Sequence, residues 1–263
     1  MKDKITYKSN NETLCIVASK KDIASMTIAK ELEMLGIKIF YLEKHFLYCE
    51  DKDLPEADIY IFLSRHSSAT GTPAFTVHSI GNFSPEEPKL GGKSATLVKT
   101  NAQLSAKLLK AIDKLEKEEP YDKFEVTPEI THHGPYLSNQ AIFIEMGSDS
   151  NVWNDPKAGK ILATAIKNVL EGPIQEQNLP CAISFGGNHY SSKFREKILT
   201  NEFIIGHMCP KYAVDYLTKD LVDQMVTKTF PKPQFGLFDK KSMKRKAEIT
   251  ELLNNHGIEV IQI

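Results

Sequence analysis

TLCIVASKKDIASMTIAKELEMLGIKIFYL, residues 13–42, contains a strand, a helix and a second strand in that order. Residues 13–18 are almost entirely apolar, which is typical of a buried strand, and the apolar residues of 21–35 recur close to the helical period. Gly36 ends the helix, and 37–42 form the second strand. A strand, a helix and a strand in succession favour a parallel sheet.

The rest of the chain continues this alternation of strands and helices. The pattern predicts further strands at 57–63, 74–78, 124–131, 141–146, 181–185, 202–205 and 258–263, and helices at 101–118, 156–170, 210–226 and 244–255. The residues 82–93 and 229–239 are rich in proline, glycine or phenylalanine, and we expect them to be loops. The predicted fold class is therefore α/β, with a mixed, mostly parallel sheet and helices on both faces.

Length and composition are those of an ordinary globular protein. The 263 residues, 41% of them hydrophobic, predict a single α/β domain over 1–263. A small C-terminal subregion, 228–263, could begin at the loop near 228–241. A formal net charge of −1 excludes a strongly basic nucleic-acid coat but allows a local basic patch. The start is polar and no apolar run approaches the ~20 residues that span a bilayer, so we expect a soluble, cytoplasmic protein without membrane contact.

Histidines are concentrated at predicted strand ends. They are His66, His78, His132, His133, His189 and His207. In an open parallel sheet, ligands bind beyond the carboxyl ends of the strands. Histidine is the commonest protein metal ligand and the acid or base best matched to neutral pH. Such residues along one edge of one sheet indicate a metal-assisted or acid–base hydrolytic site.

One carboxylate, Glu145, and one pair of adjacent histidines, His132 and His133, are the most informative candidates. Glu145 lies in an apolar strand, where its burial is costly unless it is paired or coordinates a metal. The alternative is a buried ion pair with Lys or Arg. In an extended strand His132 and His133 point to opposite sides, so both reach the cleft only if the chain bends, and Gly134 could supply that bend.

Glycines and hydroxyl groups flank the other candidates. Gly186 and Gly187 precede His189 and Tyr190, and they permit a close approach of the backbone to a ligand. Zinc hydrolases take three His or carboxylate ligands and leave one position for a water. The chain has enough such ligands, although it lacks the HExxH helix spacing. The segment 64–73 offers hydroxyls, amides and a guanidinium that suit a phosphate or carboxylate, or it is simply a polar surface loop.

Several of these motifs are long and occur in a characteristic order. They are SRHSSATGTPAFTVHSIGN (64–82), THHGP (131–135), IFIEMGS (142–148), FGGNHY (185–190) and GHMCPKYA (206–213). With them the chain resembles the archaeal and plant type of D-aminoacyl-tRNA deacylase. The resemblance implies a phosphorylase/hydrolase-like fold, zinc dependence, and hydrolysis of the ester between a D-amino acid and the 3′ end of tRNA. Departures at Tyr136, Gln140, Asn188 and Cys209 bear on pocket shape rather than on the His and Glu residues.

With this reaction in view, we assign expected roles to the candidate residues. The expected catalytic residues are Glu145, His132 and His189, and the expected zinc ligands are His132, His133, Glu145, His189 and His207. The expected substrate contacts are Ser64, Arg65, His66, Thr70, His78, Gly186, Gly187, Tyr190, Lys244 and Arg245. Among them, His66 and His78 would complete a second site or bind the terminal adenosine. Lys244 and Arg245 would contact the RNA backbone, unless they are only a solvated helix start.

Two other functions remain open from the residues alone. One is a zinc peptidase or amidohydrolase on the same fold, and the other is a noncatalytic RNA-binding module. Charged tRNA is the expected partner, and no obligate protein partner is evident. Preference for the D-isomer would need a pocket that rejects the L-form, which no motif here encodes.

Overall fold

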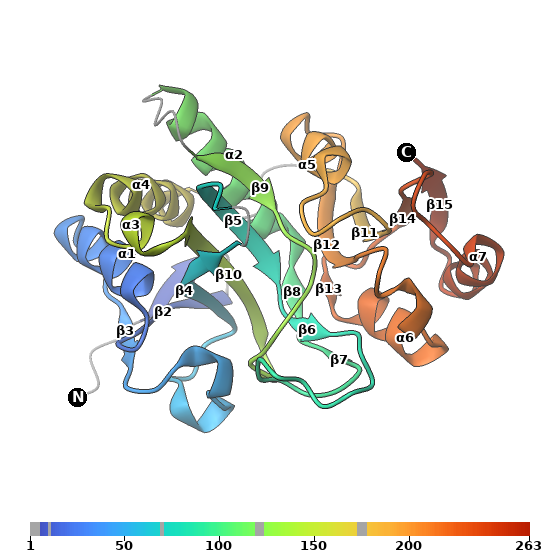
Figure 1. Cartoon of the computed structure of the whole chain (residues 1–263), viewed down its shortest axis with the longest axis horizontal. Helices are drawn as coiled ribbons and strands as arrows, with labels where there is room; N and C mark the ends of the chain where they lie inside the picture. The colour runs from blue at the N-terminus through green and yellow to red at the C-terminus, as the bar shows by residue number, and fades with distance from the viewer. Residues whose placement is uncertain (1–5, 10–11, 69–70, 119–123, 173–177) are drawn as a thin grey trace.

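The computed structural model describes residues 6–9, 12–68, 71–118, 124–172 and 178–263. Within them, a seven-stranded sheet and a four-stranded sheet lie side by side, with helix α2 (Ala102–Glu118) packed against strands of both (Figure 1). No helix in these ranges is long and apolar enough to cross a membrane.

The larger sheet is mixed. Its order is β1-β2-β4-β10-β5-β9, with β3 paired to β2. The bounds are β1 Thr6–Ser9, β2 Glu12–Ser19, β3 Phe40–Leu42, β4 Ile59–Ser67, β5 Ala74–Ser79, β9 Glu125–Pro128 and β10 Gln140–Ser148. Strands β2, β3, β4 and β10 are parallel, whereas β5 runs antiparallel to β10 and β1 antiparallel to β2.

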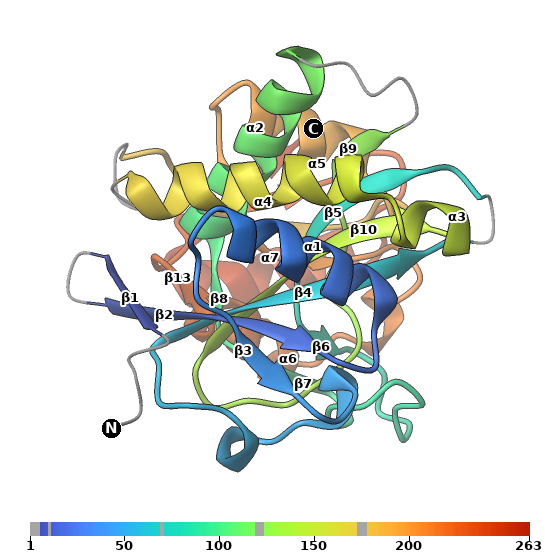
Figure 2. The same cartoon turned by 90° about the vertical axis from the view of Figure 1, so that its left-hand side faces the viewer.

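The two faces of this sheet are covered differently. Helices α1 (Ile23–Met34) and α4 (Pro156–Glu171) lie across one face, where the isoleucines and leucines of β2, β4 and β10 form the core (Figure 2). Alternation along the strands sends Phe62 and Phe143 to the opposite face. There the 3-10 helix η1 (Phe46–Tyr48) covers them, followed by η2 (Asp51–Asp53). Glu145 is two residues from Phe143 and therefore shares this second face.

The smaller sheet is entirely parallel, in the order β12-β11-β14-β15. Its strands are β11 Cys181–Phe185, β12 Ile204–Cys209, β14 Phe235–Phe238 and β15 Glu259–Gln262, and its helices are α5 Ser192–Leu199, α6 Lys219–Thr227 and α7 Lys246–Asn254. The remaining elements are β6 Gly81–Asn82, β7 Thr96–Leu97, β8 Thr100–Asn101, α3 Ser150–Trp153, η3 Val214–Tyr216 and β13 Thr229–Phe230. The segment 228–263 thus supplies strands to a sheet that also contains β11 and β12.

The α/β class and the mostly parallel sheet are confirmed. Helix α4 is capped by Asp155, whose side chain accepts from the N–H groups of Lys157 and Ala158. Several element bounds were wrong. The region 229–239 is not a loop, because it contains β13 and the inner strand β14. Gly236 allows this, since a Cβ there would lie 2.7 Å from the side chain of Leu253. The helix expected at 210–226 begins only at Lys219.

Two strands extend further than their apolar runs. Strand β4 continues through Ser64, Arg65 and His66 to Ser67, so these residues are not in a loop. Strand β12 contains Gly206 and His207 instead of ending before them. The placement of all six histidines on one edge of one sheet was also wrong, because His189 and His207 belong to the smaller sheet and its loops. Polar residues can extend a strand where both faces are buried, which hydrophobic periodicity does not register.

Candidate functional site

The centre of the site is a buried imidazole between two buried carboxylates. His66 is near the end of β4, Glu145 is on the neighbouring strand β10, and Glu129 follows β9. The Nδ1 atom of His66 lies 3.0 Å from Oε1 of Glu129 and 3.4 Å from Oε2 of Glu145. Gly147 pairs with His66 across the two strands, and a Cβ on it would lie 2.0 Å from the carbonyl oxygen of His66. The absence of a side chain at Gly147 therefore sets how closely these strands approach.

Electrostatics fix the charges of this group. Burial disfavours a charged His66, but Glu129 and Glu145 outweigh burial and raise its pKa to about 10. Burial likewise opposes ionisation of the carboxyls, but the histidines around them hold the pKa of Glu129 well below its usual range and also lower that of Glu145. Cationic His66 then donates from Nε2 to the hydroxyl oxygen of Tyr190. Burial raises the pKa of Tyr190 to about 12, which keeps its hydroxyl protonated at neutral pH.

Three histidines form a second group beside the first. The rings of His78 and His132 have centroids 4.1 Å apart, and those of His132 and His133 are 4.4 Å apart. The sequence allowed both members of the pair to reach the cleft only if the chain bends. It does bend, because His133 has a φ of +41°. The side chains of His132 and His133 therefore both point into the cleft.

In each ring of this group, Nδ1 lies within hydrogen-bond distance of a backbone carbonyl nearby in the chain. Nδ1 of His78 lies 3.0 Å from the Ser79 carbonyl, that of His132 lies 2.8 Å from the Ile130 carbonyl, and that of His133 lies 2.7 Å from the Gly134 carbonyl. A ring that donates from Nδ1 to a carbonyl leaves the Nε2 lone pair for a metal, which is the usual arrangement around metal-binding histidines. Burial and the neighbouring imidazoles lower the pKa of His132 well below its usual value and that of His133 to about 4, so both are neutral ligands at neutral pH.

His189 joins the site from the smaller sheet. It follows β11 after Gly186 and Gly187, whose φ angles of +94° and +76° turn the chain towards the larger sheet. Its Nε2 atom lies 3.4 Å from Oε1 of Glu129, and the Nε2 atom of His132 lies 3.7 Å from Oε2 of the same carboxylate. The side chain of His189 is 38% exposed, so its ring lies between the buried Glu129 carboxylate and solvent.

The donor atoms of these residues are spaced as metal ligands. Three sets have ligand atoms within 4.8 Å of one another: His78, His132 and His133; Glu129, His132 and His189; and His66, Glu129 and Glu145. Both oxygens of Glu129 and Nε2 of His78 are buried without a hydrogen-bond partner in the described part of the chain. Imidazole nitrogen and carboxylate oxygen are the donors that zinc takes in hydrolases. The residues therefore fit a zinc ion.

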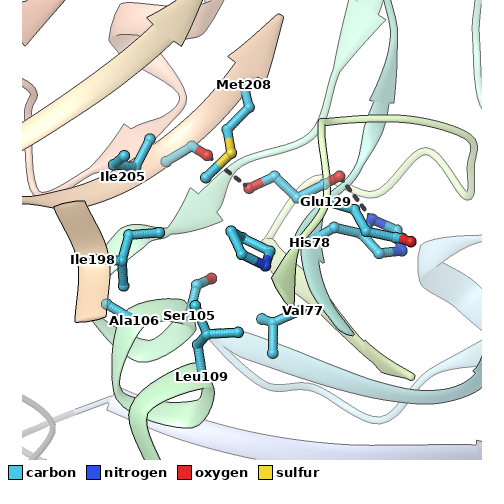
Figure 3. Close-up of a pocket in the computed structure, with 12 residues that line it drawn as sticks. Val77, His78, Ser105, Ala106, Leu109, Glu129, Ile198, Ile205 and Met208 are labelled. Carbon is cyan, nitrogen blue, oxygen red and sulfur yellow. Dashed lines mark hydrogen bonds between the residues drawn. The ribbon is translucent and has the colours of Figure 1, made fainter. Parts of the chain in front are cut away.

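Behind His78 and Glu129 the structure is apolar. A cavity of about 10 Å³, close to the space of one water, lies between α2, α5 and strands of both sheets (Figure 3). Its walls include Leu109, Ile198 and Met208. His78, Ser79, Ser105 and Glu129 supply its polar lining.

The structure brings some expected residues together and leaves others apart. His66, His78, His132, His133, Glu145, His189 and Tyr190 meet in the cluster. Among the described residues, His207 belongs to none of the three ligand sets, and its Nδ1 atom lies 3.1 Å from the Thr131 hydroxyl. Thr70 lies outside the described residues. Ser64 donates to the carbonyl of its neighbour Arg65.

The charged residues expected to bind substrate have partners in the fold. The guanidinium of Arg65 lies 5.3 Å from the ring centre of Trp153 and 3.6 Å from the Asp22 carboxylate. Arg245 donates to the carbonyls of Val214 and Leu217 and pairs with Glu248. The exposed ammonium of Lys244 lies 3.4 Å from Asp215. The side chain of Lys244 is therefore largely open to solvent, whereas that of Arg245 is mostly covered.

Glu129 is the residue that the sequence analysis missed. It belongs to two of the three ligand sets and is almost fully buried. The local signal was weak, because the predicted strand 124–131 contains two glutamates and two threonines, and Glu125 in the same stretch is exposed. The cost of burying a charge, which singled out Glu145, applies equally to Glu129.

Comparison with known proteins identifies the family. The family model described as D-aminoacyl-tRNA deacylase matches residues 54–261. A D-aminoacyl-tRNA deacylase of Ignicoccus hospitalis is 36% identical over 245 residues, covering 92% of this chain and 96% of that protein. One of Methanocaldococcus jannaschii is 33% identical over 254 residues, covering 93% of this chain and 97% of that protein. The crystal structure of a conserved protein of unknown function superposes with a TM-score of 0.86 at 26% identity, covering 95% of this chain and 94% of the other. These matches confirm the resemblance, and the chain belongs to the D-aminoacyl-tRNA deacylase family.

Proposed function

We propose that this protein hydrolyses the ester bond between a D-amino acid and tRNA, releasing the free amino acid and tRNA in the cytoplasm. Family membership supports the substrate class. The observation that carries the chemistry is Glu129, an anionic carboxylate that is buried, without a hydrogen-bond donor, and surrounded by His66, His132 and His189. A buried charge in this state is retained for chemistry rather than for stability.

Zinc is the proposed cofactor, and His78, His132 and His133 are its proposed ligands. Their Nδ1 atoms are occupied by backbone carbonyls, and their rings converge with Nε2 available. Burial lowers the pKa of His78, but Glu145 outweighs it and raises the pKa overall, so metal binding there is accompanied by loss of a proton. A bound zinc supplies a Lewis acid that makes water more acidic and polarises an ester carbonyl.

The protein groups around that position divide the remaining tasks. Nε2 of His189 faces Oε1 of Glu129 at 3.4 Å, which leaves Nδ1 of His189 to take the proton of the attacking water and return it to the departing ribose oxygen. Cationic His66 polarises the hydroxyl of Tyr190, which then suits donation to the ester carbonyl oxygen as negative charge develops there. Glu145 balances the charge of His66 and stays in place.

The test uses tRNA charged with a D-amino acid and the same tRNA charged with its L-isomer. We expect rapid release of the D-amino acid, with the L-ester largely intact. Small peptides with D-residues are offered in parallel, because a zinc peptidase on the same fold would cleave them. Cleavage of peptides with both charged tRNAs intact, or tRNA binding with no turnover, would overturn the proposal.

A further inference from the structure

Hydrolysis of a tRNA ester at this cluster requires a surface for the 3′-terminal nucleotide. His66 and His78, the residues that the sequence suggested for the terminal adenosine, are both buried. Neither can offer a ring face to a base. The base must therefore use an exposed surface within one nucleoside of the cluster, and such a surface should present an aromatic side chain.

A pocket with these properties lies beside the histidine pair. It has a volume of about 480 Å³ and is lined by residues 47–52 and 91–93 and by Tyr136. Tyr48 in η1 is 60% exposed, and the ammonium of Lys93 lies 3.8 Å from the centre of the Tyr136 ring. The volume falls within the range of pockets that hold small organic ligands.

Two structural connections place this pocket next to the site. Tyr136 is three residues after His133, so their Cα atoms are within about 11 Å of each other. The loop 91–93 packs on the turn between them, because a Cβ on Gly134 would lie 2.2 Å from the N atom of Gly92, and Gly134 donates its N–H to the carbonyl of Leu90 at 2.9 Å. The pocket is thus anchored to the backbone that carries His133.

Helix η1, which supplies Leu47 and Tyr48 to the pocket, packs on the same face of the larger sheet. Phe46 of η1 packs edge-on against Phe143 with ring centres 5.0 Å apart, and Phe143 stacks on His78 at 5.1 Å. Tyr48 is two residues further along. One short chain of ring contacts therefore connects the proposed zinc ligand His78 with the segment that presents Tyr48.

The charges around the pocket select a base rather than a phosphate. Glu50 and Lys52 pair with each other, and Asp51 accepts from the Ser138 N–H and hydroxyl. With Lys93, the pocket holds two cations and two carboxylates, so it offers no net positive field to an anion. Carboxylate and backbone carbonyl oxygens instead suit a heterocycle with an exocyclic amine.

We propose that the pocket formed by Tyr48, Lys93 and Tyr136 binds the adenine base at the 3′ end of tRNA, with Tyr48 as its stacking surface. This inference rests on the proposed function and identifies how the same site receives its substrate. The ribose then lies over the turn 133–135, which brings the aminoacyl ester to the His and Glu side chains.

The test measures binding of uncharged RNA, so it does not depend on catalysis. Two acceptor-stem minihelices, one ending in CCA and one ending in CC, are titrated against the protein by fluorescence anisotropy. The wild type should bind the CCA form about tenfold more tightly, the effect of about 1.4 kcal/mol of base stacking. Tyr48→Ala should remove this ratio, whereas Tyr48→Phe, which retains an aromatic face, should preserve it.

Tyr216→Ala is the matched control, since Tyr216 is 42% exposed and does not line the pocket. It should leave the ratio unchanged. A wild-type ratio near one, or a ratio that Tyr48→Ala leaves unchanged, would overturn the inference. Binding of the CCA end through Tyr48 without release of D-amino acids would refute the proposed function alone. Hydrolysis with a ratio insensitive to Tyr48 would refute this pocket alone.

Discussion

His66 on strand β4 and Glu129 after strand β9 meet at 3.0 Å between Nδ1 and Oε1, although 62 residues separate them in the chain and β10 and β5 lie between their strands. The contact forms because both side chains leave the same face of the larger sheet. Burial of this pair, together with Glu145, gives the site its charge distribution.

Removal of the Glu129 charge should abolish turnover. We expect Glu129→Gln to slow release of a D-amino acid from charged tRNA by at least about 100-fold, because both the orienting partner of His189 and the buried negative charge are lost. Single-turnover deacylation measures the effect. Glu125→Gln is the control, since Glu125 is an exposed carboxylate on β9. Equal rates for the two variants would show that Glu129 has no catalytic task.

Loss of a proposed zinc ligand should be visible without an activity assay. His133→Ala should lower zinc affinity by at least about 100-fold, because one of three converging nitrogens is removed. Elemental analysis after dialysis against a weak chelator measures the retained metal. His256→Ala provides the comparison, since His256 pairs with Asp223 at the end of α7, away from the cluster. Full zinc retention by His133→Ala would exclude the ligand set proposed here.

Stability should depend on pH through Asp22. Burial raises the pKa of Asp22 from 3.8 to about 6, so the folded state binds more protons than the unfolded state between these values. The free energy of unfolding should therefore fall as pH rises from about 4 to 6, by up to about 3 kcal/mol from this group. Above pH 6 the contribution of Asp22 is constant.

The variant Asp22→Asn isolates this effect. Asparagine retains an oxygen for the N–H of Ser25, which Asp22 caps in the wild type, but it carries no titrating proton. Urea unfolding should give similar free energies of unfolding for the wild type and the variant at pH 4. At pH 7 the variant should be the more stable of the two. A constant difference between the two proteins across this range would contradict the expectation.

The close contact of Gly147 with β4 should make it sensitive to a single methyl group. Gly147→Ala places a Cβ 2.0 Å from the carbonyl oxygen of His66, which the paired strands cannot avoid without moving. We expect a loss of about 1–3 kcal/mol in the free energy of unfolding, accompanied by slower deacylation. Gly172→Ala should be nearly neutral, because its Cβ would meet only the Asn168 carbonyl at 3.5 Å and its φ is −98°. Similar denaturation midpoints for both variants would rule out the strand contact as a constraint.

Local patterns in the sequence were sufficient for most elements. The apolar run at 181–185 predicted β11 without error, and the helix predicted at 156–170 agrees with α4 to within one residue. Errors arose where the neighbouring structure decides the conformation. The segment 235–238 is only four residues long, contains Gly236 and follows two prolines, all typical of a loop, yet it lies between β11 and β15 and pairs with both. Pairing with formed strands outweighs weak intrinsic preference.

The sequence by itself determined which residues are available for chemistry: buried strands ending in histidines, a carboxylate in an apolar strand, and glycines that turn the chain. It did not determine which of them meet. His207 follows the same local pattern as His189, but only His189 reaches Glu129. Glu129 was overlooked because its neighbours in the chain are less apolar than those of Glu145, although both carboxylates are buried. Convergence depends on the pairing of β4, β10, β5 and β9 and on the placement of the smaller sheet, since these fix directions and distances between residues that are remote in the chain.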